Sequence, residues 1–190
     1  MSDFKKIVYE ELMEISKLQI EYDEAVFDKF ECEWDACKCH LALVDEIGEV
    51  NHELKKMWCY WRENQSEVDR KKLLEELADC LHFAMSYYIN INIPYCSKFY
   101  TELFYMDTIE GIVSKLAKHI EEVCESKYLT VFSLQKYRDE VESIVDFKVP
   151  IDLPVGVLAV SKLCRFSFDE LIEAYKEKNK INWKRLENGY

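Results

Sequence analysis

The chain has 190 residues, of which 49% are hydrophobic and 14% aromatic, and this composition excludes a disordered chain and suffices for a substantial core. Asp and Glu number 37 against 25 Lys and Arg, which gives a net charge of −12, and an acidic surface repels nucleic-acid backbones and anionic membranes. We therefore expect neither a nucleic-acid polymer nor a membrane as a partner.

The hydrophobic pattern predicts an all-α protein. The chain has only 4 Gly and 3 Pro, and so few turn-forming residues favour long helices over a many-stranded sheet. Apolar residues at helical spacing predict helices over residues 4–29, 35–62 and 70–91. The polar segment 62–70 connects the second of these helices to the third, and Pro94 disfavours helix in the residue before it.

Helical patterns resume in the second half of the chain, over residues 108–127, 133–146 and 155–166. The segment 147–156 contains two prolines and is the clearest predicted loop. The sequence SFDE then predicts the start of the last helix, because Ser167 and Glu170 have the spacing of a capping box. No internal repeat or low-complexity stretch is evident, so we expect a single domain over residues 1–190.

Two pairs of acidic residues, each spaced i, i+3, lie among apolar neighbours: Glu46 with Glu49, and Glu76 with Asp79. On a helix each pair shares one face, which we expect to point inward. Inward carboxylates repel one another and cannot stay ionised in a dry core without a cation. Mg²⁺ binds oxygen ligands and keeps waters for substrate phosphates, so the four acids predict a Mg²⁺ site, with Mn²⁺ as a substitute, in an enzyme that acts on phosphates.

Simpler interpretations of these acids remain open. The first pair fits a solvated acidic helix face as well, and Asp79 has His82 or an arginine as an alternative partner. Phe83 follows one turn after Asp79, where it either holds a nucleotide base near the metals or belongs to the plain core.

One face of the predicted last helix carries cations and amides, because Tyr175, Lys178, Asn182 and Arg185 follow helical spacing. Such a face suits a polyphosphate. The alternative is an ordinary basic helix end, which the helix macrodipole favours.

The eight cysteines raise a second metal hypothesis. A group of Cys32, Cys37, Cys39 and His40 invites a zinc site, but it lacks a C-x-x-C pair, which favours ordinary thiols. The N-terminus shows no signal peptide, and no run reaches the roughly 18–20 apolar residues of a transmembrane helix. We therefore expect a cytoplasmic protein with reduced thiols.

The pattern E-x-x-E followed by E-x-x-D resembles that of the all-α nucleoside triphosphate pyrophosphohydrolases, the MazG-like superfamily. Within it the chain is similar to the dimeric dUTPases of phage and bacterial type. The C-terminal K-N-x-x-N-x-x-R followed by G-Y is the most particular motif. The resemblance covers most of the chain and rests on LQIEYD (18–23), DEIGE (45–49), WCYW (58–61), EELADCLHF (75–83) and YKEKNKINWKRLENGY (175–190).

The resemblance implies a helical bundle that acts as a homodimer and hydrolyses dUTP to dUMP and pyrophosphate. It assigns the metal to Glu46, Glu49, Glu76 and Asp79. It assigns the uracil pocket to Gln19, Trp61 and Phe83, with Trp58 as an alternative to Trp61. It assigns the phosphates to Lys178, Asn182, Arg185 and Tyr190. Glu46 or Glu49 is the expected general base, with Asp45 as a further candidate.

Two other functions remain open at the level of sequence. One is a related dNTP pyrophosphohydrolase with another base preference, such as dCTP or a MazG-like range, or one that also accepts dUDP. The other is a catalytically inactive helical interaction protein. The four acids and the complete C-terminal motif favour an active enzyme.

Overall fold

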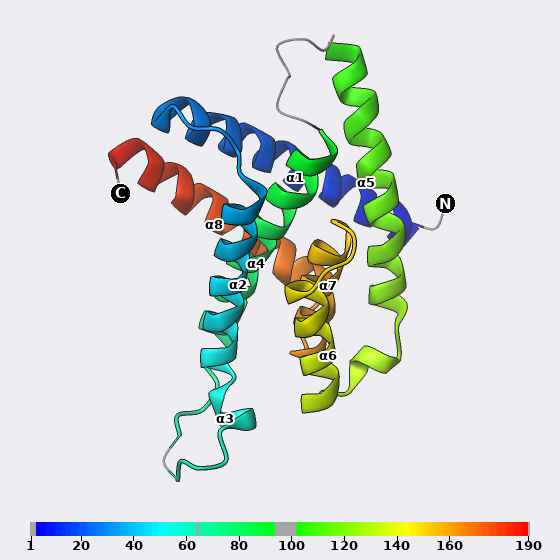
Figure 1. Ribbon diagram of the computed structural model, residues 1–190. Helices are drawn as coiled ribbons and strands as arrows, with labels where there is room; N and C mark the ends of the chain where they lie inside the picture. Colours follow the sequence, from blue (N-terminus) through cyan, green and yellow to red (C-terminus); the bar gives the residue numbers. More distant parts are fainter. Residues whose placement is uncertain (1–2, 64, 94–101, 190) are drawn as a thin grey trace.

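The computed structural model describes residues 3–63, 65–93 and 102–189, with only the backbone given for 102–105. Within these ranges the protein is built from helices and contains no strand, which confirms the expected all-α fold (Figure 1). Tyr190 lies outside the described residues. The helices are α1 (Asp3–Phe30), α2 (Ala36–Glu53), α3 (Lys55–Trp58), α4 (Arg70–Asn92), α5 (Glu102–Glu125), α6 (Leu134–Val145), α7 (Asp152–Leu163) and α8 (Phe168–Asn188), with a 3₁₀ turn, η2 (Tyr128–Thr130).

Polar side chains fix the starts of the helices that carry the site. Asp35 precedes α2 and accepts a hydrogen bond from the Lys38 backbone N–H at 2.9 Å. Asp69 does the same for α4. The predicted capping box of α8 is confirmed, because the Ser167 and Glu170 side chains each accept from the other residue's backbone N–H. These caps satisfy N–H groups that have no partner inside the helix.

Three predicted boundaries are wrong. Helix α5 begins at Glu102 instead of at residue 108. The helix expected over 35–62 ends at Glu53, and α3 is a separate short helix, tied back to α2 by a hydrogen bond from Trp58 Nε1 to the Asn51 carbonyl at 3.0 Å. The loop expected over 147–156 is partly helix, since α7 begins at Asp152. Pro154 falls in the first turn of α7, where its missing N–H costs no intrahelical hydrogen bond.

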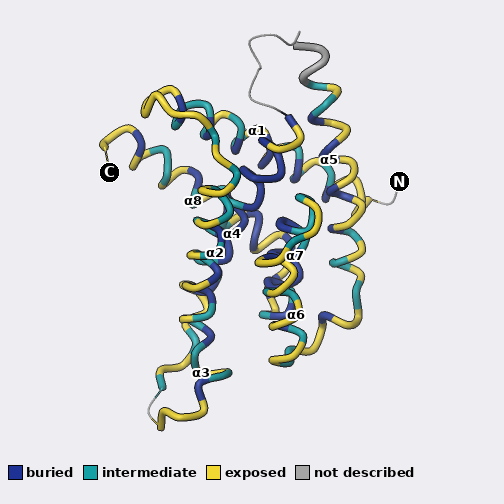
Figure 2. Tube along the Cα trace, viewed as in Figure 1, coloured by how far each residue is buried: buried dark blue, intermediate teal, exposed yellow. Residues whose placement is uncertain are grey.

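Helix α4 forms the centre of the bundle and packs against α1, α2, α7 and α8. Buried residues follow nearly the whole second half of α4, which Figure 2 shows as a dark blue stretch. The apolar run after Asp79 therefore predicted a buried helix correctly.

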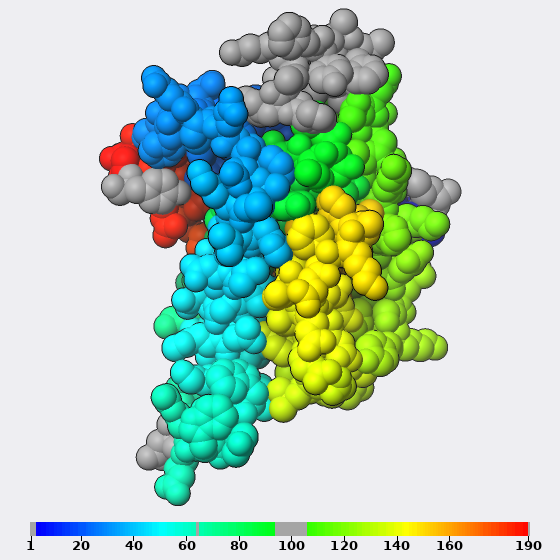
Figure 3. Space-filling model, viewed as in Figure 1, coloured from blue at the N-terminus to red at the C-terminus, as the bar shows by residue number. Residues whose placement is uncertain are grey.

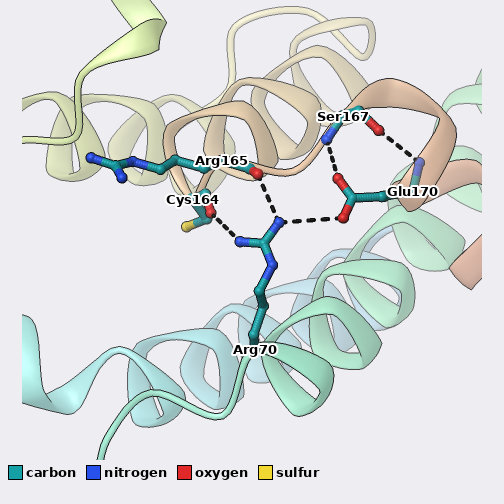
Figure 4. A network of polar contacts seen from close by, with 5 residues as sticks. All are labelled: Arg70, Cys164, Arg165, Ser167 and Glu170. Carbon is teal, nitrogen blue, oxygen red and sulfur yellow. Dashed lines mark hydrogen bonds and ion pairs between the residues drawn. The ribbon is translucent and has the colours of Figure 1, made fainter.

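The start of α8 is held against the start of α4 by Arg70 (Figure 4). Its guanidinium donates to the carbonyl oxygens of Cys164 and Arg165, at 3.3 and 2.8 Å, and contacts the Glu170 carboxylate at 3.3 Å. The guanidinium also lies 4.0 Å from the centre of the Phe166 ring. This contact orients α8 along the bundle, where its later residues reach α1 and α4.

Helices α2 and α4 run antiparallel as the two sides of a long hairpin (Figure 1). Residues 54–63 and 65–69, which we call the arm, lie between these helices in the chain and extend beyond the rest of the described molecule (Figure 3). Helix α1 runs parallel to α8, because Lys176 contacts Glu11 and Glu14 while Trp183 stacks edge-on against Tyr22. None of the described helices is long and apolar enough to cross a membrane.

Candidate active site between α1, α2, α4 and α8

Three carboxylates meet where α2 faces α4. One carboxylate oxygen from each of Glu46, Glu76 and Asp79 lies within 4.8 Å of the others. We call these three residues the acidic cluster. The antiparallel packing of α2 and α4 explains the arrangement. It sets the first acidic residue on one helix opposite the second acidic residue on the other helix.

Glu49 is exposed, so the expectation that all four acids face inward is wrong for this residue. It still lies close enough to Glu76 to raise the pKa of that carboxyl by charge repulsion. Glu49 therefore borders the acidic cluster on its solvent side.

The acidic cluster carries more negative charge than its protein surroundings neutralise. Burial, followed by the charges of Asp79 and Glu76, raises the pKa of Glu46 to about 7. Burial also raises the pKa of Glu76 and of Asp79, while Lys178 opposes both shifts. The Lys178 ammonium forms an ion pair with Asp79. Asp79 thus forms its ion pair with a lysine from α8, and the nearby charge of Arg185 also favours its ionised form.

The acidic cluster could hold a divalent metal. It offers only carboxylate oxygens, the donors that hard divalent cations prefer. Lys178 supplies positive charge at the position where a cation is needed. The donor set and the unbalanced charge both fit such an ion.

A cavity of about 520 Å³ opens beside the acidic cluster and is bordered by Glu46 and Asp79. Its volume falls within the range of small-molecule sites. Six residues predicted from the sequence line it together: Gln19, Glu46, Asp79, Phe83, Asn182 and Arg185. The walls also contain aromatic rings from Tyr22, Phe27, Phe30 and Trp34. The cavity therefore combines an apolar, aromatic part with charged groups.

A buried hydrogen-bond network forms the wall of the cavity on the α1 side. Asp23 accepts hydrogen bonds from Gln19 Nε2 at 2.7 Å, Ser86 Oγ at 2.7 Å and Asn90 Nδ2 at 2.8 Å. Burial raises the pKa of Asp23 to about 6, although these three donors oppose the shift. The side chain of Gln19 is thus held between α1 and α4.

The side-chain amide oxygen of Gln19 contacts Tyr175 and His82. Gln19 Oε1 accepts from the Tyr175 hydroxyl at 2.6 Å and lies 2.9 Å from His82 Nδ1. The rings of His82 and Tyr175 stack, with centroids 3.9 Å apart. Burial lowers the pKa of His82 to about 4, so its ring is neutral near pH 7. Tyr175, expected on a phosphate-binding face, is instead fully buried beside Gln19.

Trp61 does not border the cavity. It lies on the arm, is 61% exposed, and contacts Tyr60 and Trp58. Trp58 is half-buried against the end of α2 and does not line the cavity either. The tryptophan in the cavity wall is Trp34, which stands just before the cap of α2 and stacks edge-on against Tyr87.

Sequence reasoning missed Trp34 and Asp23. Trp34 sits in a connection, where helical periodicity gives no information. A signal for Asp23 existed, because Gln19 and Asp23 are spaced i, i+4 and share a helix face.

The cysteine and histidine group does not form a metal site among the described residues. Cys32 and Cys37 are exposed, and the Cys39 thiol donates to the Phe83 carbonyl at 3.5 Å. His40 stacks edge-on against Phe147. In the described part of the chain, the acidic cluster is the one group whose ligand atoms converge.

Comparison with known proteins agrees with this arrangement. No curated protein matches the chain. The profile of a known family, described as dUTPase, matches residues 11–190 and so includes every residue that lines the cavity. The chain belongs to this family, the dimeric all-α dUTPases, and is a dUTP diphosphatase.

Proposed function

We propose that the enzyme hydrolyses dUTP to dUMP and pyrophosphate in a Mg²⁺-dependent reaction at the acidic cluster. One observation carries this proposal: the acidic cluster and an aromatic cavity of about 520 Å³ share Glu46 and Asp79. A nucleotide needs both environments, because its base is flat and largely apolar while its phosphates are anionic.

Glu46, Glu76 and Asp79 would hold the metal, with Glu49 completing the set from the solvent side. Mg²⁺ held there would supply Lewis-acid chemistry, which offsets charge on the phosphates and lowers the pKa of water. Mn²⁺ prefers the same oxygen donors and would substitute. Glu46 or Glu49 accepts a proton from the attacking water, and the exposed position of Glu49 favours Glu49.

The base would lie in the aromatic part of the cavity. Phe83 and Trp34 supply rings, and Gln19 supplies a polar group on the buried wall. Trp61 lies on the arm, so within one subunit the proposal gives the ring contact to Trp34 instead. Rings packed against the sugar leave no room for a 2′-hydroxyl, which would select deoxyribose.

The phosphates would meet one face of α8. Asn182 and Arg185 line the cavity, and Lys178 reaches Asp79 one turn earlier. Tyr190 follows on the same tail and remains part of the proposal. Charged donors of this kind bind phosphate oxygens strongly. In the substrate complex the phosphates would share Lys178 with Asp79.

Turnover assays test the proposal. With Mg²⁺ we expect hydrolysis of dUTP to dUMP and pyrophosphate, at least tenfold faster in kcat/KM than hydrolysis of dCTP, dATP, dGTP or dTTP. Excess EDTA should abolish the reaction. A preference for dCTP would support the related pyrophosphohydrolase instead. No turnover of any dNTP would support the inactive interaction protein.

We also propose that the enzyme is a homodimer and works in the cytoplasm. Membership of the dimeric dUTPase family supports the dimer.

A further inference from the structure

The Asp23 carboxylate is buried beside the cavity and is bound by neutral donors. It is 8% exposed. Its Oδ1 accepts from Gln19, and its Oδ2 accepts from Ser86 and Asn90. An ionised carboxylate can only accept hydrogen bonds. Every group facing it must therefore present a donor.

This requirement fixes the orientation of the Gln19 amide. With Nε2 toward Asp23, Gln19 Oε1 accepts from the Tyr175 hydroxyl and from His82 Nδ1–H, and the neutral His82 ring then turns its unprotonated Nε2 toward the Tyr175 carbonyl at 3.2 Å. The reverse orientation would place Oε1 2.7 Å from a carboxylate oxygen, where two acceptors repel. Repulsion from the charged Asp23 carboxylate outweighs the contact of the neutral His82 Nε2 with the Tyr175 carbonyl, so Asp23 selects one of the two amide orientations.

In the selected orientation Gln19 offers the cavity a donor. Both lone pairs of Oε1 are used by Tyr175 and His82, whereas within the described residues Nε2 has only Asp23 as its acceptor. One N–H of Nε2 remains, on a side chain that lines the cavity. Uracil and cytosine differ at ring position 4, where uracil carries a carbonyl acceptor and cytosine an amino donor.

We propose that Asp23 is a positioning residue for base selection, which holds the Gln19 amide so that the cavity accepts a 4-keto pyrimidine and rejects a 4-amino pyrimidine. This inference rests on the proposed function, since it takes the cavity as the site of the pyrimidine. The inference gives Asp23 no contact with the reacting phosphates. A change at Asp23 therefore alters only which base the cavity binds.

Asp23→Asn would reverse the orientation of the Gln19 amide. The Oδ1 of the new asparagine can accept from Ser86 and Asn90, as Oδ2 of Asp23 does. The Nδ2 of the asparagine would then donate to Gln19 Oε1. Gln19 Nε2 would donate to Tyr175 and His82, leaving the Tyr175 hydroxyl to donate to the Ile15 carbonyl, now 3.3 Å away. His82 Nε2–H would donate to the Tyr175 carbonyl, now 3.2 Å away. Every polar group keeps a partner, but Gln19 now presents an acceptor to the cavity.

The test compares dUTP with dCTP in wild type and in Asp23→Asn. We expect the ratio of kcat/KM for dUTP to kcat/KM for dCTP to fall by about tenfold or more in the variant, because the hydrogen bond at position 4 is reversed. Calorimetry with dUMP and dCMP should show the same change in the ratio of the two Kd values, without turnover. Circular dichroism checks the fold. If Asp23→Asn does not fold, Asp23→Ser, which also removes the carboxylate, replaces it and should lower the same ratios.

Asn90→Ala is the matched control. Asn90 donates to Asp23 but does not line the cavity, so its loss leaves the polarity of Gln19 unchanged. We expect the dUTP:dCTP ratio to stay within about twofold of wild type. In a Gln19→Leu background, Asp23→Asn should have no further effect on the ratio, because the side chain through which Asp23 acts is gone.

Equal losses of kcat/KM for both nucleotides in Asp23→Asn, with an unchanged ratio of Kd values, would overturn the inference. Failure of the wild type to hydrolyse dUTP would instead contradict the proposed function. The ratio of Kd values for dUMP and dCMP still decides the role of Asp23 in that case.

Discussion

At the scale of single residues, the buried Asp23 carboxyl makes the stability of the protein depend on pH. Its pKa rises from 3.8 to about 6 on folding, mainly because burial disfavours the charged form. The folded state therefore binds this proton more tightly than the unfolded state. The contribution of Asp23 to stability is greatest below pH 3.8 and is lost as the pH rises through about 6.

Asp23→Asn should remove this pH dependence. Relative to wild type, the unfolding free energy of the variant should increase by roughly 2–3 kcal/mol when the pH is raised from 4 to 8. Urea denaturation of both proteins at the two pH values measures it. A difference that does not change with pH would show that Asp23 does not titrate in this window.

Substitutions of two neighbouring glutamates of α4 distinguish a role in the acidic cluster from a general effect of charge. Glu76 belongs to the acidic cluster, while Glu75 is exposed and pairs with Lys71 at 3.6 Å. Glu76→Gln should lower kcat for dUTP by at least about 100-fold, because the proposed metal site would lose one of its ligands. Without metal it should melt at or above the wild-type temperature, since repulsion with Asp79 is relieved.

Glu75→Gln serves as the control for this prediction and should change kcat by less than about twofold. Differential scanning fluorimetry in EDTA, and again with added Mg²⁺, gives the melting temperatures. Wild-type kcat in Glu76→Gln would mean that the carboxylate at position 76 is structural.

At the scale of elements, the sequence predicted helices better than it predicted their ends. The buried α4 and the capping box of α8 followed from local signals, namely an uncharged run and the spacing of Ser167 and Glu170. The end of α2 at Glu53 has no such signal, because Leu54 and Cys59 are apolar and fit a continuing helix. Their burial, at 4% and 2% exposure, depends on how the arm folds back.

Arg70 provides a test of how α8 is oriented. Its guanidinium joins the start of α4 to the α7–α8 junction through two carbonyl groups, Glu170 and the Phe166 ring (Figure 4). Arg70→Ala should lower the unfolding free energy by about 1–2 kcal/mol, more than an ordinary exposed ion pair contributes.

Arg165→Ala is the control for Arg70, because the Arg165 side chain is exposed and points away from Arg70 in Figure 4. It should change the unfolding free energy by less than about 0.5 kcal/mol. Chemical denaturation measures both variants. Equal effects of the two substitutions would show that the Arg70 contacts add no stability.

At the scale of the whole molecule, helical periodicity predicted which residues share a helix face but not which helices pack together. The i, i+3 spacing placed Glu46 and Glu49 on one face and Glu76 and Asp79 on another, and the antiparallel packing of α2 and α4 then brings the faces together. No spacing along the chain could show that Trp34 lines the cavity and Trp61 does not. That difference depends on where the connections lead once the helices have packed.

The arm offers a surface for the proposed homodimer. Tyr60 and Trp61 are 92% and 61% exposed, and a second subunit would remove these aromatic side chains from water. Light scattering at micromolar concentration should give twice the chain mass of 22.7 kDa.

The double variant Tyr60→Ser, Trp61→Ser should raise the Kd of the dimer by at least about tenfold, since burying two aromatic side chains contributes more than 1.4 kcal/mol. Tyr128→Ser, at a position that is 56% exposed on η2, should leave this Kd unchanged. A wild-type mass of one chain would contradict the homodimer. A double variant that dimerises like wild type would instead place the interface on another surface.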